Sequence, residues 1–482
     1  MDSELYIRQY LNQQLEHGHQ ALSLKLIDSQ KSRLLIRKLQ RYIQQFLGGE
    51  KQADRWVIIP GLRGVGKTTI LAQTYIWLEA THNIEDINLI YISLDEIIPQ
   101  LNSNLNQVMQ VYAQVLGHDW INCKKPTFVF IDEVQLDINW AQTLKVIYDK
   151  NPNLFFICSG SSATYLQLNA DVAGRRAIIE RLYPLAFTEY QLLAYNKDSS
   201  PHFKDELMTI LYYSDSADIV FKKLKQKRLL LDRAWAKYDS NNLDHYLTMG
   251  TMPFALHQTN REKTYIALRG MIDQVINNDI QAVKNFNQGS LAVIRRLMFL
   301  LADSGDVVSL ETLGKVLGVD KKQIWEMLDT LLKTELLIKV NAYGNHYTAT
   351  RKPARYHFMS PAIRLTLASS ISNRNLTIAR RGRLLEDIVS LYYYQNFAIN
   401  HKADLTYPYS VNNQKNCDFI LKILNSHNIA LEFSLGKKDI KQLVATMKTI
   451  DCRYGLVFSD SNLKLIKDQN IIKIPIHYFF LS

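Results

Sequence analysis

The residues from Gly61 to Thr68, GLRGVGKT, have the types and spacing of a loop that binds phosphate. They fit the pattern G-x4-G-K-[ST], and they lie between the apolar run 57–60 (VIIP) and a helical pattern, as this loop requires. Glycines let backbone amides close around an anion, Lys67 supplies positive charge to the terminal phosphates, and the Thr68 hydroxyl can ligate magnesium. The residues predicted to contact a bound ATP are Gly61, Arg63, Gly64, Val65, Gly66, Lys67, Thr68, Thr69, Asp132 and Ser161.

A second set of polar residues follows two later apolar runs. The run FVFID closes on Asp132 and is followed by Glu133, and ligands in open parallel sheets bind at the carboxyl ends of strands. We expect Asp132 to hold Mg²⁺ together with the Thr68 hydroxyl, and Glu133 to polarise the attacking water, with an ordinary polar turn as the alternative. After the run FFICSG, one of three serines could sense the γ-phosphate: Ser159, Ser161 or Ser162. These residues predict an ATP- and Mg²⁺-dependent hydrolase.

Arg175 and Arg176 are two further basic candidates. An arginine near the nucleotide can stabilise charge on the transferring phosphoryl group, from the same chain or from a neighbouring subunit. We therefore place Arg175 with Lys67 and Glu133 among the catalytic candidates, and a basic pair on the surface is an equal alternative. An arginine supplied by a neighbour would require an oligomer, whereas Arg175 could equally act within its own chain, so both a monomer and an oligomer remain open.

The apolar pattern indicates the elements that must position these residues. Short β-branched and aromatic runs at 57–60, 89–94, 128–132 and 155–160 alternate with longer helical segments, which predicts an α/β domain with a parallel sheet covered by helices. Strand signals then vanish from about 200 to 285. The chain divides into helices at 1–50, the α/β core at 51–197, a helical subdomain at 198–288, three helices and a hairpin at 289–370, and a last α/β unit at 371–482.

The element at 289–370 has the order of a winged helix-turn-helix. Three amphipathic helical segments, the second capped by Ser309, are followed by the strand LLIKV and a turn at Gly344. The third helix starts with Lys321, Lys322 and Gln323, and in this interpretation it reads a groove of nucleic acid. The alternative is that the element only packs against the ATPase core.

Composition excludes several classes of protein. With 47% hydrophobic and 21% charged residues, the 482-residue chain is globular rather than disordered or fibrous. The net charge of +11 favours phosphate-bearing partners. Apolar runs are shorter than the ~18 residues that cross a bilayer, the start does not resemble a signal peptide, and the four cysteines are scattered. We expect a cytoplasmic protein with reduced thiols and no membrane partner.

An ordered set of motifs resembles the prokaryotic AAA-type ATPases that carry a C-terminal domain of unknown function. The resemblance covers roughly residues 30–482 and implies an AAA-type core, a helical lid at 198–288, a winged helix, and a last domain similar to restriction-endonuclease-like nucleases. The motifs are IDEVQ with the following Trp140, Leu144, Lys145, Tyr148 and Asp149, then SGSSA (159–163), AGR (173–175), PLAFTEY (184–190), YLTMGTMP (246–253) and IPIHYFFL (474–481).

Nucleases of this PD-(D/E)xK type use carboxylates to gather magnesium and a lysine to position water. Matched to that arrangement, the candidates are Glu386, Asp418 and Glu432, with Asp418 and Glu432 as metal ligands. Ser434 stands where the lysine belongs, and Lys437 or Lys438 could replace it, Lys437 being the predicted one. An active nuclease, an inactive fold that binds nucleic acid, and a protein-contact domain remain open.

Two functions are compatible with these features. The first is an ATP-driven switch or motor that acts on nucleic acid, DNA by preference, through the winged helix and the nuclease-like domain, in genome defence. The second is an ATP-gated regulatory or scaffold protein that acts on a protein partner and carries an inactive nuclease-like domain.

Overall fold

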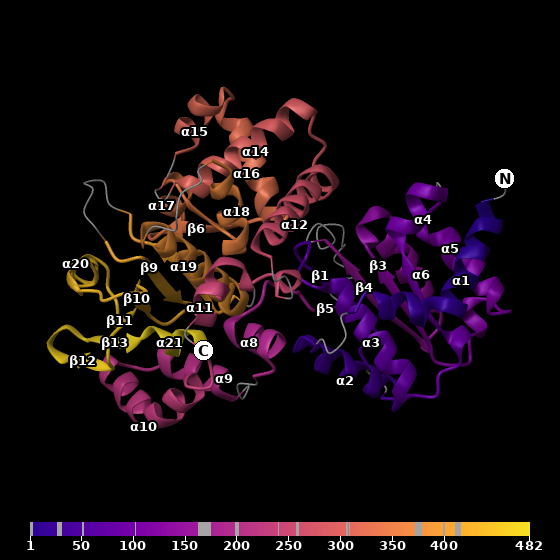
Figure 1. Cartoon of the computed structure of the whole chain (residues 1–482), viewed down its shortest axis with the longest axis horizontal. Coiled ribbons are helices and arrows are strands. Elements are labelled where there is room, and N and C mark those ends of the chain that lie inside the picture. Colours follow the sequence, from indigo (N-terminus) through magenta and orange to yellow (C-terminus); the bar gives the residue numbers. More distant parts are fainter. Residues whose placement is uncertain are drawn as a thin grey trace. The chain divides into compact units, whose positions relative to one another are not determined.

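The chain forms two compact units, each described here by itself (Figure 1). Unit 1 comprises Met1–Tyr183 and Asn277–Asn285, and unit 2 comprises Pro184–Ile276 and Phe286–Ser482. The finer division into five parts stays a prediction. The structure is a computed structural model that describes residues 3–26, 31–50, 53–101, 103–161, 175–197, 202–239, 241–256, 260–304, 307, 309–371, 378–398, 401–409 and 416–482.

The sheet of unit 1 is parallel and has the strand order β2-β3-β4-β1-β5. The four runs predicted as strands are confirmed, and the predicted α/β class with them. The fifth strand, β5, was missed because two residues are too short to give a pattern. The strands are β1 (Trp56–Pro60), β2 (Leu89–Ser93), β3 (Thr127–Asp132), β4 (Leu154–Gly160) and β5 (Ile178–Ile179).

Helices account for the burial of this sheet. Every residue of β1, β2, β3 and β4 is buried, as continuous apolar runs in a parallel sheet require. The segment Asn277–Asn285 adds the end of η7 (Val275–Asp279) and α13 (Ile280–Val283). The other helical elements are α1 (Ser3–Leu24), α2 (Leu35–Leu47), α3 (Lys67–Thr81), η1 (Asp86–Asn88), α4 (Leu94–Leu101), α5 (Leu105–Val115), η2 (Trp120–Asn122), η3 (Val134–Leu136) and α6 (Trp140–Lys150).

Unit 2 begins with helices, as the lack of strand signals predicted. They are α8 (Phe187–Tyr195), α9 (His202–Tyr212), α10 (Ala217–Trp235), α11 (Asn241–His245), η5 (Tyr246–Gly250), η6 (Pro253–Ala255) and α12 (Arg261–Gln274). Later helices are α18 (Pro361–Ile371), α19 (Ile378–Tyr393), η8 (Tyr394–Ala398), α20 (Lys441–Thr449), η9 (Lys467–Gln469) and α21 (Ile476–Leu481).

Three helices and two antiparallel strands occupy the region predicted as a winged helix. They are α14 (Gln288–Asp303), α15 (Leu310–Leu317), α16 (Lys321–Lys333), β6 (Leu337–Ala342) and β7 (Arg355–Phe358), with the short α17 (His346–Arg351) between the strands. Ser309 caps α15 by accepting from the Thr312 amide, and Asp320 with Gln323 forms a capping box on α16. The starts of α15 and α16 therefore coincide with capping residues that are local sequence patterns.

One mixed eight-stranded sheet runs through the rest of unit 2 in the order β12-β13-β11-β10-β9-β8-β6-β7. Strand β6 pairs with β8 through Asn341 and Thr406, so the sheet continues across the boundary predicted at residue 370. The strands after α19 are β8 (Ala403–Tyr407), β9 (Phe419–Ile423), β10 (Asn428–Phe433), β11 (Tyr454–Ser459), β12 (Lys464–Ile466) and β13 (Ile471–Pro475).

Two further properties concern the helices and the cysteines. Among the described residues, the helices are too short or too polar to cross a bilayer. All four cysteines are free thiols, three of them buried and Cys452 half-buried.

Candidate functional site

The glycine loop lies at the carboxyl end of β1 and leads into α3. Gly64 and Gly66 have φ angles of 83° and 93°, a left-handed conformation that side chains disfavour. A Cβ atom at Gly61 would overlap the carbonyl oxygen of Leu182. Glycine is therefore required at these positions to keep the loop tight, and the amides of a tight loop at a helix start form a cradle for phosphate.

Arg33 fixes this loop from outside. Its Nη1 donates to the carbonyl oxygens of Val65 and Tyr183, at 2.8 Å each, and the side chain is buried. One guanidinium thus joins the loop to the segment after β5. The sequence contained no signal for this role, because Arg33 is more than 20 residues before the motif.

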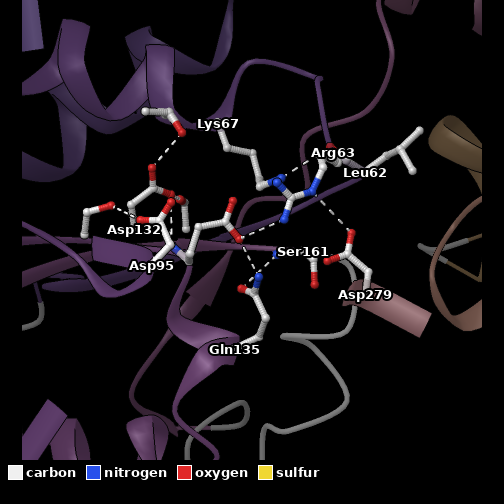
Figure 2. A network of polar contacts seen from close by, with 12 residues as sticks. Leu62, Arg63, Lys67, Asp95, Asp132, Gln135, Ser161 and Asp279 are labelled. Carbon is white, nitrogen blue, oxygen red and sulfur yellow. Dashed lines mark hydrogen bonds and ion pairs between the residues drawn. The ribbon is translucent and has the colours of Figure 1, made fainter. Parts of the chain in front are cut away.

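Lys67 and Thr68 lie beside the acid predicted to share magnesium (Figure 2). Lys67 Nζ donates to the carbonyl oxygens of Gly61 and Leu62, at 2.9 and 3.3 Å. Thr68 Oγ1 donates to Asp132 Oδ2 at 2.6 Å. A hydroxyl and a carboxylate in contact, next to an ammonium and loop amides, are the donor set that magnesium and a triphosphate need. The residues present therefore fit both groups.

The carboxylate of Asp132 is surrounded by donors. Besides Thr68, it accepts from the Tyr91 hydroxyl at 3.1 Å, from the Ser159 hydroxyl, and from the Glu133 amide at 3.0 Å. Burial and the charge of Asp132 raise the pKa of Tyr91 well above its usual value, so the phenol keeps its proton. Tyr91 was not predicted, although its place near the end of β2 could have indicated it.

Glu133 is tied to the serine at the end of β4. Its backbone is left-handed, with φ of 56°, and its carboxylate accepts a hydrogen bond from Gln135 Nε2. Gln135 Oε1 in turn accepts from the Ser161 amide at 3.0 Å (Figure 2). The buried Ser161 hydroxyl has no hydrogen-bond partner within the described part of the chain, which suits a group that bonds to a ligand.

Arg63 connects the loop to two acids. Its guanidinium lies 4.0 Å from Glu133 Oε2 and 3.7 Å from Asp279 Oδ2 (Figure 2). Burial raises the pKa of Asp279 to about 6, against the opposing charges of Arg63 and Lys67. No sequence pattern marks Asp279, since it lies 146 residues after Glu133 in a helical segment without a motif.

Within the described part of the chain, the side chains of the remaining ATP-site predictions lie outside this network of polar contacts. Val65 is buried, Thr69 is half-buried in the first turn of α3, and Arg175 is exposed. Arg176 pairs with Asp149 through two nitrogens at 2.7 and 2.9 Å. Ser162 and residues 173–174 of the AGR motif lie outside the described residues. The catalytic role of Arg175 stays a prediction.

The acids predicted for the nuclease-like site lie close to one another in unit 2. Burial and then the charge of Asp418 raise the pKa of Glu386 to about 7 and that of Glu432 to about 8. Burial raises the pKa of Asp418 as well, although this acid accepts from the Phe433 amide at 2.7 Å. Within the described chain, however, these acids do not form a three-ligand group that could hold a metal ion.

The lysine at this cluster is Lys438, one residue after the predicted Lys437. Lys438 Nζ lies 2.7 Å from Glu432 Oε1. Lys437 and Lys438 both line a hollow of about 650 Å³ at the carboxyl ends of β10, β11 and β13. The loop after β10 thus brings an ammonium to Glu432 even though Ser434 occupies the expected position.

Comparisons with known proteins agree with the ATP-site geometry. The family model described as "AAA domain" matches residues 53–191, and a domain of unknown function (DUF8612) matches residues 240–375. The AAA-type resemblance is therefore confirmed. The match to the domain of unknown function spans α11 to α18 and so includes the three-helix region. The nuclease-like identity of residues 371–482 stays a prediction.

Solved structures align only distantly. The ORC1 protein of Aeropyrum pernix in complex with DNA has 11% identity and a TM-score of 0.33 over 71% of this chain and 94% of its own. DnaA of Aquifex aeolicus bound to AMPPCP has 15% identity and a TM-score of 0.25 over 65% of this chain and 90% of its own. Scores this low carry no argument about fold or function.

A curated relative spans nearly the whole chain. The uncharacterized protein MJ1637 of Methanocaldococcus jannaschii is 30% identical over 451 residues, which is 93% of this chain and 88% of the relative. The chain belongs to the family of MJ1637, and it carries an AAA-type P-loop domain at residues 53–191.

Proposed function

We propose that unit 1 binds ATP with Mg²⁺ and hydrolyses it. The observation that carries this proposal is the 2.6 Å contact between Thr68 Oγ1 and Asp132 Oδ2 beside the glycine loop. The amides of the loop and Lys67 would hold the phosphates, and Thr68 with Asp132 would hold the metal. Bound magnesium supplies positive charge that neutralises the phosphates.

Glu133 is the group that would accept or orient the proton of the attacking water. Its carboxylate is held by Gln135, which also accepts from the Ser161 amide. A movement of Ser161 towards a terminal phosphate would therefore shift the Gln135 side chain and, through it, the Glu133 carboxylate. This link supports Ser161 as the residue that senses the γ-phosphate and Gln135 as the residue that positions the base.

Two substitutions test the proposal. Lys67→Ala removes the ammonium that meets the phosphates, so calorimetry should find ATP binding weakened at least tenfold. Glu133→Gln keeps the shape but cannot take a proton, so it should bind ATP like the wild type and hydrolyse it at least a hundredfold more slowly. Glu85→Gln, on an exposed acid paired with Lys125, is the matched control. Normal turnover in Glu133→Gln would remove Glu133 from this role.

The nucleotide state would act on nucleic acid through unit 2. The three helices and β6–β7 have the order of a winged helix, and α16 starts with two lysines. The alternative, a scaffold for a protein partner, predicts no mobility shift with DNA even at low salt. Nucleic-acid binding predicts a shift that weakens steeply as salt is added.

A more specific proposal is that unit 2 also cleaves the nucleic acid that it binds. The contact of Lys438 with Glu432, near Asp418, favours it, because a lysine beside carboxylates is what such a site uses. A magnesium-dependent cleavage assay of the wild type, Asp418→Ala and Glu432→Ala tests it. Cleavage that persists in both variants would come from another site or a contaminant.

A further inference from the structure

A groove of about 540 Å³ lies between α16, β6 and the segment after α17. Lys321, Trp325 and Leu328 lie on one face of α16, since residues three and four apart share a helix face, and they line one wall. Lys339 on the exposed side of β6 and Arg351 with Lys352 line the other wall. The groove is thus built by the helix and by the two-stranded part of the same element.

The charge of this groove is strongly positive. Its two acids are already paired with lysines that do not line it: Glu311 with Lys315 at 3.1 Å, and Asp329 with Lys333 at 2.7 Å. The four cations in the walls have no acidic partner within the described part of the chain: Lys321, Lys339, Arg351 and Lys352. Cations concentrated in a concave surface attract phosphate.

Aromatic side chains stand among these cations. Trp325, which lines the groove, is 56% exposed, and Tyr347, which contacts the groove residue Arg351, is 66% exposed. The guanidinium of Arg351 lies 4.8 Å from the centre of the Tyr347 ring, and its Nη1 donates to the Tyr347 hydroxyl at 2.6 Å. An exposed indole beside cations that have no acidic partner is the combination on which unstacked bases bind, because every base has a face that stacks.

We propose that this groove binds single-stranded nucleic acid, with a base on Trp325 and phosphates on Lys321, Lys339, Arg351 and Lys352. The inference rests on the nucleic-acid part of the proposed function and names the form of its ligand. A hollow of this volume takes one or two nucleotide units, as small-molecule sites of similar size do. The base edges of a duplex are instead read by an element, such as a helix, that enters its major groove.

The test is fluorescence anisotropy of the full chain with a labelled oligothymidylate of about 12 nucleotides, in EDTA so that no cleavage occurs. The wild type should bind this strand more tightly than a blunt duplex of equal length. Trp325→Ala should weaken binding roughly tenfold and Trp325→Phe much less, because phenylalanine still stacks. Lys339→Glu should weaken binding and reduce the salt slope by about 0.7, the value of one phosphate contact.

Matched controls separate the groove from general charge and from major-groove binding. Val316→Ala removes an apolar side chain of similar exposure, 55%, on α15 outside the groove, and it should stay within about twofold of the wild type. Lys263→Glu changes an exposed lysine on α12 that does not line the groove, and it should change binding little. Lys322→Glu, at the start of α16 but outside the groove lining, tests major-groove binding, and it should weaken binding less than Lys339→Glu. Uridylate strands of the same length test RNA against DNA.

Two results would overturn the inference. One is equal loss in Lys322→Glu and Lys339→Glu together with a preference for duplex, which would indicate that the start of α16 reads a major groove. The other is unaltered binding in Trp325→Ala and Lys339→Glu. ATP binding by the same samples is the separate readout: if it is intact while the groove variants behave as the wild type, the ATPase proposal stands and the groove proposal fails.

Discussion

Asp132 and Glu432 are both buried acids near the carboxyl end of a strand, yet their surroundings are opposite. Asp132 in unit 1 meets donors from Thr68, Tyr91 and Ser159 and from the next backbone amide. Glu432 in unit 2 is fully buried near Asp418 and meets the ammonium of Lys438. Burial and the second acid raise the pKa of Glu432 to about 8.

The difference shows that an acid at a strand end is not by itself a metal site. The oxygens of Asp132 meet three hydroxyl groups and a backbone amide, and bound magnesium would compete with the hydroxyls for the same oxygens. Glu432 holds a proton more readily than an ordinary glutamate, and a metal would have to displace that proton first. The groups around the acid, rather than its position on the sheet, therefore decide whether it is suited to bind a metal ion.

The largest expected effect is the loss of hydrolysis when Asp132 loses its charge. Asp132→Asn keeps the size of the side chain but gives magnesium a neutral ligand, so ATP hydrolysis should fall at least a hundredfold. Asp404→Asn, an exposed acid on β8, is the matched control and should hydrolyse ATP at the wild-type rate. A steady-state phosphate-release assay measures both. A fall of less than threefold in Asp132→Asn would mean that the metal is held elsewhere.

A smaller effect is expected on the stability of unit 2, and it depends on pH. Because the folded-state pKa of Glu432 is raised above the ordinary value of 4.5 to about 8, the protonated form favours folding. The associated stability is complete below about pH 4.5 and is lost as pH rises through 8. Glu432→Gln mimics the protonated form, so it should be more stable than the wild type by about 1–3 kcal/mol at pH 9 and equally stable near pH 5.

Urea unfolding at several pH values measures this difference. Asp404→Asn should show no such pH-dependent gain, because its side chain is exposed. If Glu432→Gln were less stable than the wild type at pH 9, the pair with Lys438 would outweigh the burial of the charge, and Glu432 would resemble Asp132 after all.

The parts of the ATP site that are contiguous in sequence could be predicted, and the parts that depend on long-range contacts could not. The loop from Gly61 to Thr68 and the acids that follow β3 sit in motifs flanked by clear strand and helix patterns. Arg33 and Asp279 reach the same loop from distant segments. Their side chains have no neighbours in sequence that would mark them, so only the packing of the chain assigns them.

The same limit applies to unit 2. The helix starts at Ser309 and Asp320 could be predicted because a cap is a local pattern. The pairing of β6 with β8 could not, since it joins strands about 60 residues apart. Which of Lys437 and Lys438 contacts Glu432 depends on the path of the loop after β10. The alternation of side chains between the two faces of a sheet predicts positions only within the strand, so it does not extend to this loop.

The smallest expected effect concerns Asp279, an acid of unit 1 that resembles Glu432 in its raised pKa, here about 6. Above pH 6 its negative charge faces Arg63 and Lys67 and opposes the phosphates that these cations would bind. Asp279→Asn removes that charge, so ATP affinity at pH 7.5 should rise about threefold to tenfold. Below about pH 5 the wild-type side chain is protonated, and the two proteins should bind ATP equally.

Calorimetry at several pH values measures this, and the ratio of the two affinities is the informative quantity, because the γ-phosphate of ATP titrates in the same range for both proteins. The opposing possibility is that Asp279 acts mainly by holding Arg63 in position, at 3.7 Å. In that case Asp279→Asn would weaken ATP binding, and lowering the pH would weaken binding by the wild type towards the same value. The sign of the change at pH 7.5 therefore distinguishes electrostatic opposition from positioning, and its disappearance at low pH shows that the proton on Asp279 is responsible.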